Sequence, residues 1–174
     1  MQCLIGFEVS ILRGIDILRN TLSEISTVGE LLAASSVIRV NFEIKYENEG
    51  DSFLYAVLKI ITTHEAPVVL KNLIKLEEKL EKEFYSTHFK AYLLSYSDHL
   101  NLNPSLLLPH PKLIKNKTFL VGSTEVWGQY IHPVLNKNLT SLAQNIDVKE
   151  IQFIAQGKSI LRPVSRPLEK IKIA

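Results

Sequence analysis

The sequence is poor in cysteine, and this scarcity limits both its chemistry and its compartment. Cys3 is the single cysteine among 174 residues, so no disulfide can form within the chain. No pair of Cys or His residues has the spacing of a zinc site either. We therefore expect a protein of the reducing cytoplasm, and we predict no metal site from these residues.

Long hydrophobic runs and a strong net charge are also absent. Every apolar stretch is far shorter than the roughly 20 residues that a membrane-spanning helix requires. The first residues lack the basic and apolar regions of a signal peptide. The net charge of +2 is too small to attract nucleic acids through a general basic field. We expect neither a membrane nor a nucleic acid as a partner.

What the chain does have is the composition of one globular domain. Hydrophobic residues make up 46% of the sequence and charged residues 22%, which is enough to build a core of its own. We place this domain at residues 1–156. Residues 157–174 contain two prolines and clustered basic residues, and we interpret them as a loosely held basic C-terminal tail. A basic anchor for an anionic partner is the alternative interpretation of this tail.

The apolar patterns predict the order strand, helix, strand, strand, helix, strand. Strands are expected where β-branched and aromatic residues gather, at residues 1–7, 32–40, 53–63 and 89–96. Helices with apolar residues three and four apart are expected after a cap at Ser10 and again from Pro67 to Phe84. This order is typical of the split βαβ unit. We predict an α+β fold, a ferredoxin-like βαββαβ core with helices packed on an antiparallel sheet and a C-terminal extension.

The segment that follows the strand at 89–96 carries the candidate chemistry. A turn at Ser97-Asp98 and a second extended run lead to a predicted loop after Pro109-His110. Four potential cations lie within eight positions of this loop: His110, Lys112, Lys115 and Lys117. They could bind phosphate oxygens by charge-assisted hydrogen bonds, or form an ordinary exposed loop. Further on, we expect a short apolar segment around Val126-Trp127 and a helix from Leu139 to Ile146.

No single motif identifies an enzyme, but a series of short motifs in order does resemble a known family. The best of them are Ser35-Ser36-Val37-Ile38-Arg39, Pro109-His110-Pro111 and His132-Pro133-Val134-Leu135. With their neighbours, over residues 5–142, they are similar to hydroxymethyl-dihydropterin pyrophosphokinase (HPPK). This family transfers pyrophosphate from ATP to a hydroxymethyl pterin in folate biosynthesis. The resemblance implies the family's ferredoxin-like fold, which agrees with the order of elements predicted above.

The resemblance also implies candidate binding residues. His110 and Lys117 match an ATP-contacting histidine and an arginine of the family, and Lys112 lies between them, so these three are nucleotide-binding candidates. Phe119 matches the aromatic residue that stacks on the pterin, and Tyr55 stands where the family has a pterin-binding asparagine. Asn41 lies in the loop that clamps the pterin in the family. Tyr55, Phe119 and Asn41 are therefore the pterin-pocket candidates.

The departures from the family concern the metal ions. Two aspartates on one strand hold two magnesium ions in the family, and the matching positions here are Lys90 and Tyr92. Phosphoryl-type transfer depends on metal ions that neutralise and orient the polyphosphate. A lysine repels such a cation and a tyrosine cannot replace the carboxylate. We therefore predict no catalytic or metal-binding residues, a degenerate member of the family that is a pseudoenzyme, and ATP with Mg²⁺ as cofactors only if the family activity survives.

Three hypotheses remain. The first is an HPPK-like protein without the transfer chemistry, which binds a nucleotide, a pterin-like small molecule or a protein. The second is an active pyrophosphokinase that recruits its metals through other carboxylates: Glu8, Glu43 or Asp98. The third is a protein-interaction scaffold whose cleft is plugged by large side chains: Phe7, Phe42, Tyr55 and Tyr92.

Overall fold

A central antiparallel β-sheet organises the chain. The computed structural model describes residues 1–40, 53–84, 87–147, 149 and 151–157. Its elements are β1 (Gln2–Ser10), α1 (Gly14–Glu24), η1 (Ile25–Thr27), β2 (Glu30–Ala34), β3 (Val37–Val40), β4 (Phe53–Ile61), α2 (Ala66–Glu83), β5 (Phe89–Tyr96), α3 (Lys112–Lys115), α4 (Lys117–Trp127), β6 (Ile131–His132), β7 (Lys137–Asn138), α5 (Leu139–Ala143) and β8 (Ile151–Ala155). The strands of the large sheet follow the order β5-β1-β4-β3-β8, and β2 pairs with β4 as well.

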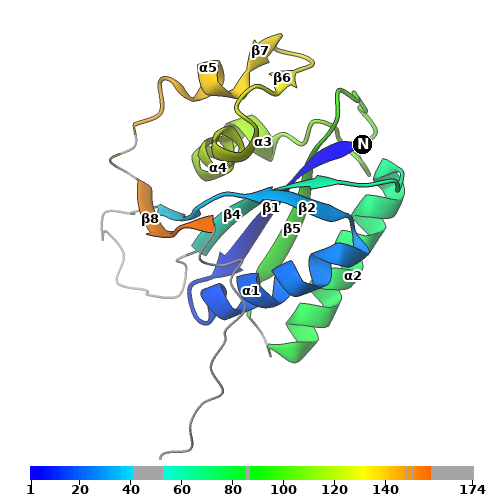
Figure 1. The fold of residues 1–174 in the computed structure, drawn as a ribbon, viewed down its shortest axis with the longest axis vertical. Coiled ribbons are helices and arrows are strands. Elements are labelled where there is room, and N and C mark those ends of the chain that lie inside the picture. The colour runs from blue at the N-terminus through cyan, green and yellow to red at the C-terminus, as the bar shows by residue number, and fades with distance from the viewer. Residues whose placement is uncertain (41–52, 85–86, 148, 150, 158–174) are drawn as a thin grey trace, which may run out of the picture.

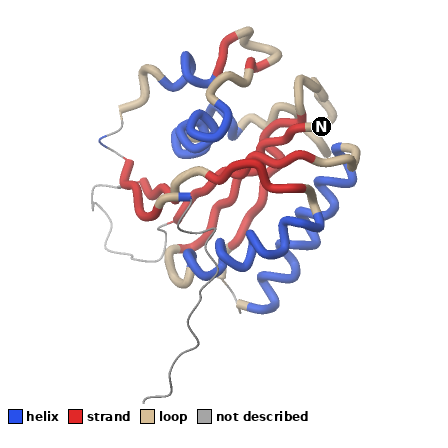
Figure 2. The backbone as a smooth tube through the Cα atoms, viewed as in Figure 1, coloured by secondary structure: helices blue, strands red, loops and turns tan. Residues whose placement is uncertain are grey.

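Helices cover both faces of this sheet. Helices α1 and α2 lie on one face, while α4 and the segments around α3 and α5 lie on the other (Figures 1 and 2). All pairs of neighbouring strands in the sheet are antiparallel. The predicted α+β fold with helices on an antiparallel sheet is therefore confirmed. Residues 158–174 of the predicted tail lie outside the described residues.

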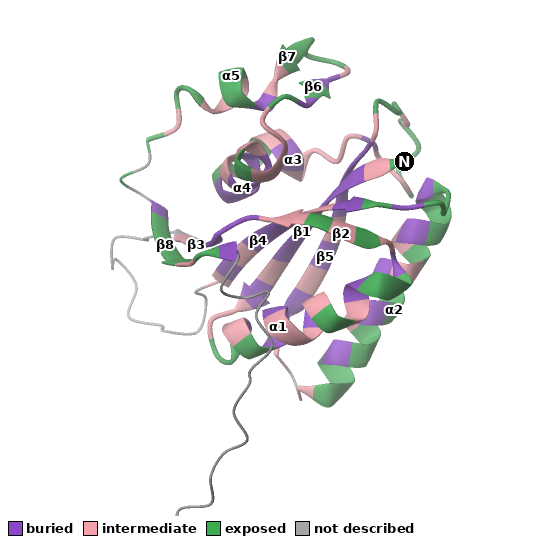
Figure 3. Ribbon diagram, viewed as in Figure 1, coloured by how far each residue is buried: buried purple, intermediate pink, exposed green. Residues whose placement is uncertain are grey.

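The sheet separates two apolar cores because successive side chains of a strand point to opposite faces. Cys3, Ile5 and Phe7 of β1 belong to the core under α1 and α2. Leu4, from the same strand, belongs to the core under α4. Figure 3 shows the buried positions gathered in the strands and on the inner sides of the helices. No helix in the described part of the chain is long and apolar enough to cross a membrane.

The first helix begins later than predicted. Ser10 is the last residue of β1, because its N–H donates to the carbonyl of His88 at 2.9 Å and its backbone pairs with Phe53. Helix α1 then starts at Gly14 after Arg13, which has a positive φ of 58°. Pairing with two distant segments extends the strand, and the local sequence around Ser10 does not reveal these partners.

The single strand predicted at residues 32–40 is wrong, since the chain forms β2 and β3 there with a break at Ser35-Ser36. The carboxylate of Glu125, in α4, stabilises the chain at this break. Glu125 accepts hydrogen bonds from the Ser36 N–H at 2.8 Å and from the Ser36 hydroxyl at 2.9 Å. The Ser35 hydroxyl accepts from the Val57 N–H at 2.8 Å, so β4 remains bonded across the interruption. The break depends on a residue 89 positions away, which no local pattern shows.

The predicted basic loop after His110 is also wrong, because its lysines lie in helices. Lys112 and Lys115 begin and end α3, and Lys117 begins α4. The Asn116 side chain caps α4 by accepting hydrogen bonds from two backbone N–H groups of its first turn. The apolar segment predicted around Val126-Trp127 is the end of this helix. Helix α5 covers only Leu139–Ala143 of the predicted longer helix, and β8 was not predicted.

Candidate functional site

The candidate residues meet on the α4 face of the sheet, where β1, β4 and β5 lie side by side. In the register of these strands, Glu8 stands opposite both Tyr55 and Lys90, and Gly6 stands opposite Tyr92. Directly opposite residues in an antiparallel pair point to the same face. The sheet therefore brings together side chains from three strands that are more than 30 residues apart in sequence.

Phe119, in α4, packs beneath the side chains of Tyr55 and Tyr92, against the sheet. Its side chain is completely buried, at 0% exposure, within the core under α4. Its ring packs edge to face against Tyr55 at 5.4 Å and against Tyr92 at 5.6 Å between ring centroids. A Cβ atom at Gly6 would lie 2.7 Å from the Phe119 ring, so only glycine allows this close approach. The Phe119 ring is thus enclosed by the protein itself.

Lys112 bridges the hydroxyl of Tyr92 and the carboxylate of Glu8. Its Nζ donates to the Tyr92 hydroxyl at 2.6 Å and to Glu8 Oε2 at 3.1 Å. Burial lowers the pKa of Lys112, but its bonds to Tyr92 and Glu8 outweigh this effect and raise the pKa above its ordinary value. The other Glu8 oxygen lies 3.0 Å from His88 Nε2. The Glu8 side chain is only 13% exposed, so this carboxylate is enclosed by its two partners.

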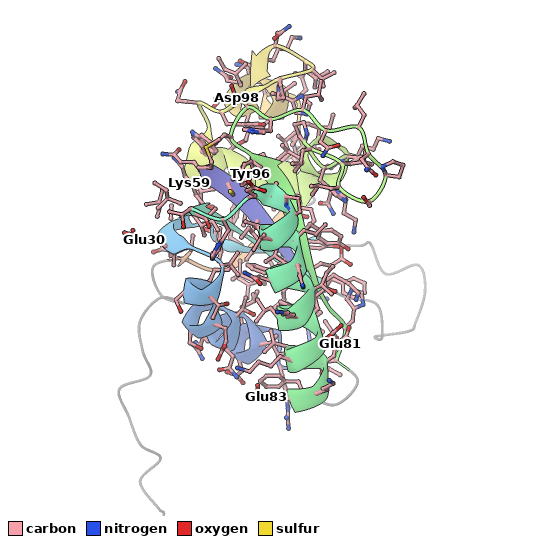
Figure 4. The ribbon with its side chains drawn as sticks, turned by 90° about the vertical axis from the view of Figure 1, so that its right-hand side faces the viewer. Glu30, Lys59, Glu81, Glu83, Tyr96 and Asp98 are labelled. Carbon is pink, nitrogen blue, oxygen red and sulfur yellow. The ribbon has the colours of Figure 1, made fainter. Side chains whose placement is uncertain are left out.

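The Lys90 side chain does not contact these residues, although Lys90 lies in the same strand as Tyr92. Strand β5 is at the edge of the sheet, and the Lys90 side chain reaches Glu77 Oε2 at 3.1 Å and Glu81 Oε1 at 3.4 Å on α2. Glu81 is labelled on this helix in Figure 4. The hydrogen bond from Lys90 to Glu77 is the main cause of the raised pKa of Lys90. Glu77 also accepts the Ala91 N–H at 2.7 Å, which covers part of the free edge of β5.

His110 lies beside Tyr92, with 5.4 Å between their ring centroids. Its Nδ1 accepts the backbone N–H of Lys112 at 3.1 Å, which leaves Nε2 to carry the ring proton. Burial, followed by the positive charge of Lys112, lowers the pKa of His110 below its ordinary value. Of the three nucleotide-binding candidates, the structure brings His110 and Lys112 together, while Lys117 is exposed at the start of α4.

The pterin-pocket candidates Tyr55 and Phe119 are in direct contact. Burial and then the negative charge of Glu8 raise the pKa of Tyr55, which keeps its hydroxyl protonated. Asn41, the third candidate, lies outside the described residues, as do Phe42 of the plugged cleft and Glu43 of the substitute metal ligands.

Phe7 and Asp98 lie away from this cluster. The plugging role predicted for Phe7 is wrong, because its ring stacks on Phe89 at 5.7 Å on the opposite face of the sheet, in the core under α1 and α2. Asp98 is exposed at the far end of β5 from Glu8, so the two carboxylates cannot share a metal ion. Within the described ranges, no group of three or more His, Cys, Asp or Glu residues could hold a metal.

The polar partners of the cluster were not predicted from the sequence. Glu8 was considered only as a substitute metal ligand, whereas it pairs with Lys112 104 positions away. Glu77 and Glu81 of α2 bind Lys90 of β5, and no local pattern in the sequence shows this contact. Among the residues that shape this site, only Asn116 could have been recognised from its neighbours in sequence. An asparagine followed by an apolar run predicts the cap of a helix.

The partly buried His110 predicts a decrease in stability at mildly acidic pH. Its pKa is lower in the folded protein than in the unfolded chain, so the unfolded state takes up the proton first as the pH falls through about 6.5. His110 should not change the free energy of unfolding above about pH 7.5, and it should lower this free energy as the pH falls from there to about 5.5. His110→Asn should weaken this dependence, because asparagine can accept the same N–H without titrating.

Urea unfolding monitored by circular dichroism at both pH values measures this effect. His99→Asn is the matched control, because His99 is an exposed histidine and its replacement should leave the wild-type dependence intact. An equal pH dependence in the His110→Asn variant and the wild type would contradict the prediction. His132 is buried and its pKa is also lowered by burial, so it accounts for the pH dependence that remains in the His110→Asn variant.

Known structures, but no sequence families, match this chain. No model of a protein family matches it, and no curated protein does. The crystal structure of wild-type HPPK-DHPS from Plasmodium falciparum is similar over 87% of this chain and 48% of its own, with a TM-score of 0.68 and 12% identity. The A437G form with SDX-DHP gives a TM-score of 0.71 at 12% identity, over 87% of this chain and 48% of that one.

The structure of the wild-type protein with pteroate gives a TM-score of 0.67 and 15% identity, over 86% of this chain and 44% of that one. The chain therefore spans less than half the length of these proteins. At such low identity, the likeness shows the fold alone. The HPPK-like fold implied by the sequence motifs is confirmed.

Proposed function

We propose that this chain is a relative of the pterin pyrophosphokinases that does not perform their transfer reaction and acts as a binding module. One observation carries the proposal: Lys112 Nζ lies between Glu8 and Tyr92, in the region where the resemblance expects two aspartates and two magnesium ions. An ammonium group fixed at this point repels a divalent cation. The carboxylate of Glu8, which could have offered oxygen ligands, is already held by Lys112 and His88.

The missing metal sites bear directly on the chemistry. Pyrophosphoryl transfer places several negative charges close together, and magnesium ions normally neutralise them and align the reacting oxygens. Magnesium requires nearly octahedral oxygen coordination, usually with one or two carboxylates. At the two matching positions, Lys90 binds the carboxylates of α2 and Tyr92 offers a phenol that is engaged by Lys112. These residues support binding of an anion better than binding of a metal.

The pterin side of the site supports the same conclusion. Structures of similar fold have been solved with pterin and with pteroate, so a pterin-like ligand is the first candidate to consider for this chain. A ligand that stacks on Phe119 needs one free face of its ring. Here Tyr55, Tyr92 and the backbone at Gly6 surround that ring. The contacts favour a filled pocket, in which the protein's own side chains replace the ligand.

A second candidate function is nucleotide binding without turnover. The observation in its favour is the position of His110, whose Nε2–H is available for hydrogen bonding close to the positively charged Lys112. Such a pair can bind a phosphate group without a metal ion. Lys117, at the exposed start of α4, is the third candidate for the same ligand. Isothermal calorimetry with ATP alone, and then with a pterin, distinguishes this function from a module that binds another protein.

The decisive test is an assay of AMP release. We expect the purified protein, with ATP, Mg²⁺ and hydroxymethyl-dihydropterin, to form no more AMP than the same protein after heat denaturation. An active pyrophosphokinase of the family, assayed in parallel, shows that the substrates are competent. AMP formation that requires both the pterin and Mg²⁺ would refute the proposal and would establish an active enzyme with other metal ligands.

A further inference from the structure

The Glu8 carboxylate is held in the way that a bound anion is held. One of its oxygens lies 3.0 Å from His88 Nε2, and the other accepts a hydrogen bond from Lys112 Nζ at 3.1 Å. The Glu8 side chain is only 13% exposed, whereas the side chains of His88 and Lys112 are 40% and 36% exposed. Solvent therefore reaches both nitrogen-bearing side chains, while the carboxylate that they bind is largely enclosed.

Glu8 differs from two other carboxylates of the sheet region because it bonds no backbone group. Glu125 accepts the N–H of Ser36, and Glu77 accepts the N–H of Ala91, so both stabilise strands of the sheet directly. In the part of the chain that the structure describes, the hydrogen bonds of Glu8 go to side chains alone. Replacing the Glu8 carboxylate by another anion therefore breaks no backbone hydrogen bond of the sheet.

Two further donors lie beside the same position. The Tyr92 hydroxyl accepts from Lys112 Nζ at 2.6 Å, so its own O–H can donate to an anion. The His110 ring packs against that of Tyr92, and its Nδ1 accepts a backbone N–H, which leaves Nε2–H to donate. A phosphate group carries more charge than a carboxylate and has three strong acceptor oxygens. It can therefore bind donors for which Glu8 has no further oxygen.

We propose that Glu8 occupies an oxyanion site formed by His88, Lys112 and Tyr92, and that a phosphate group binds there by displacing the Glu8 carboxylate. Glu8 is then an autoinhibitory residue, because its negative charge competes with the ligand for the same donors. The inference deepens the proposed function and rests on it, since a phosphate group binds here without a metal ion. The ligand is a free phosphate or pyrophosphate, or the terminal phosphate of a nucleotide.

Removal of the Glu8 side chain tests this competition. Calorimetric titrations with pyrophosphate and with ATP are carried out in EDTA, so that no metal ion takes part. Glu8→Ala should bind the anion about tenfold more tightly than the wild type, because Lys112 and His88 then bond it without a competitor. Glu24→Ala is the matched control, because Glu24 also pairs with a lysine, Lys79, at 2.8 Å. It changes the net charge equally and should leave the affinity unchanged.

A double variant shows where the anion binds. Adding Lys112→Met to Glu8→Ala should abolish the gain in affinity, because it removes the ammonium group that both anions share. Glu8→Gln keeps the shape of the side chain and provides the same comparison if Glu8→Ala fails to fold. The proposal is overturned if neither anion binds a Glu8 variant more tightly than the wild type. It is also overturned if the gain survives Lys112→Met, because the anion then binds elsewhere.

The two ligands distinguish the source of the phosphate group. An equal gain for pyrophosphate and ATP supports a site for the phosphates alone, whereas a gain for ATP only supports a nucleotide. Adenosine should show no gain, and a gain for adenosine would overturn the proposal, because adenosine has no phosphate. These titrations contain neither magnesium nor a pterin. Their failure is therefore distinguishable from AMP release, which would refute the proposed function instead.

Discussion

Replacing Phe119 by alanine is expected to lower the free energy of unfolding by about 3–5 kcal/mol. Phe119 is fully buried, and its ring contacts the rings of Tyr55 and Tyr92 and the backbone at Gly6. Its removal leaves a cavity in a core that has no room to collapse around it, and it also ends two aromatic contacts. A phenylalanine that merely lined an open ligand pocket would lose far fewer contacts.

The matched control is Phe153→Ala, because Phe153 is a phenylalanine of the same sheet with 56% of its surface exposed. We expect this change to cost less than about 1 kcal/mol. Urea unfolding of both variants, followed by tryptophan fluorescence of Trp127, gives the two free energies. Similar losses for the two variants would mean that Phe119 is not part of a packed core, and the proposal of a filled pocket would lose its main support.

Much of the fold could be predicted because its strands and helices have clear local patterns. β4 is rich in aromatic and β-branched residues, β5 is rich in aromatic and other apolar residues, and α2 carries the apolar residues Val69, Leu73 and Leu80 on one side. These patterns are properties of short segments, so they do not require knowledge of the rest of the structure. The order of the elements then restricted the topology to an antiparallel sheet covered by helices.

The errors arose where distant residues determine the local structure. The break between β2 and β3 depends on Glu125, which bonds the backbone and hydroxyl of Ser36 from helix α4. The lysines after His110 have the composition of a loop, yet the Asn116 side chain and the burial of Phe119 fix a helix there. Strand β8 forms because β3 offers an edge to pair with, while its own sequence is short and half exposed.

The candidate site could be located from the sequence, but its interactions could not. The motifs named Tyr55, Lys112 and Phe119 as candidates and Tyr92 as a departure from the family, and the structure brings these four side chains into contact. The motifs did not show that the charge of Lys112 is directed inward, towards Glu8, or that Lys90 turns away to α2. Sequence spacing places residues on strands and faces, whereas the choice of ionic partner depends on side chains that meet only in the folded protein. That choice is what distinguishes a metal site from a closed polar cluster.

Replacing Lys112 by methionine is expected to lower the free energy of unfolding by about 2 kcal/mol, because it leaves the enclosed carboxylate of Glu8 without its main partner. Lys112 itself is 36% exposed, so solvent screening keeps the loss below that of a fully buried pair. Lys115→Met is the matched control in the same short helix, and this exposed residue should contribute less than about 0.5 kcal/mol.

A double variant separates the ion pair from simple loss of packing. Adding Glu8→Gln to Lys112→Met removes the stranded charge, so we expect the double variant to recover more than half of the lost stability. A double variant that is less stable than Lys112→Met alone would contradict this account, because each residue would then contribute independently of the other. Recovery, in contrast, would mean that the lysine is required by the carboxylate of its own protein. A phosphate ligand would then have to compete with Glu8 for the ammonium group of Lys112.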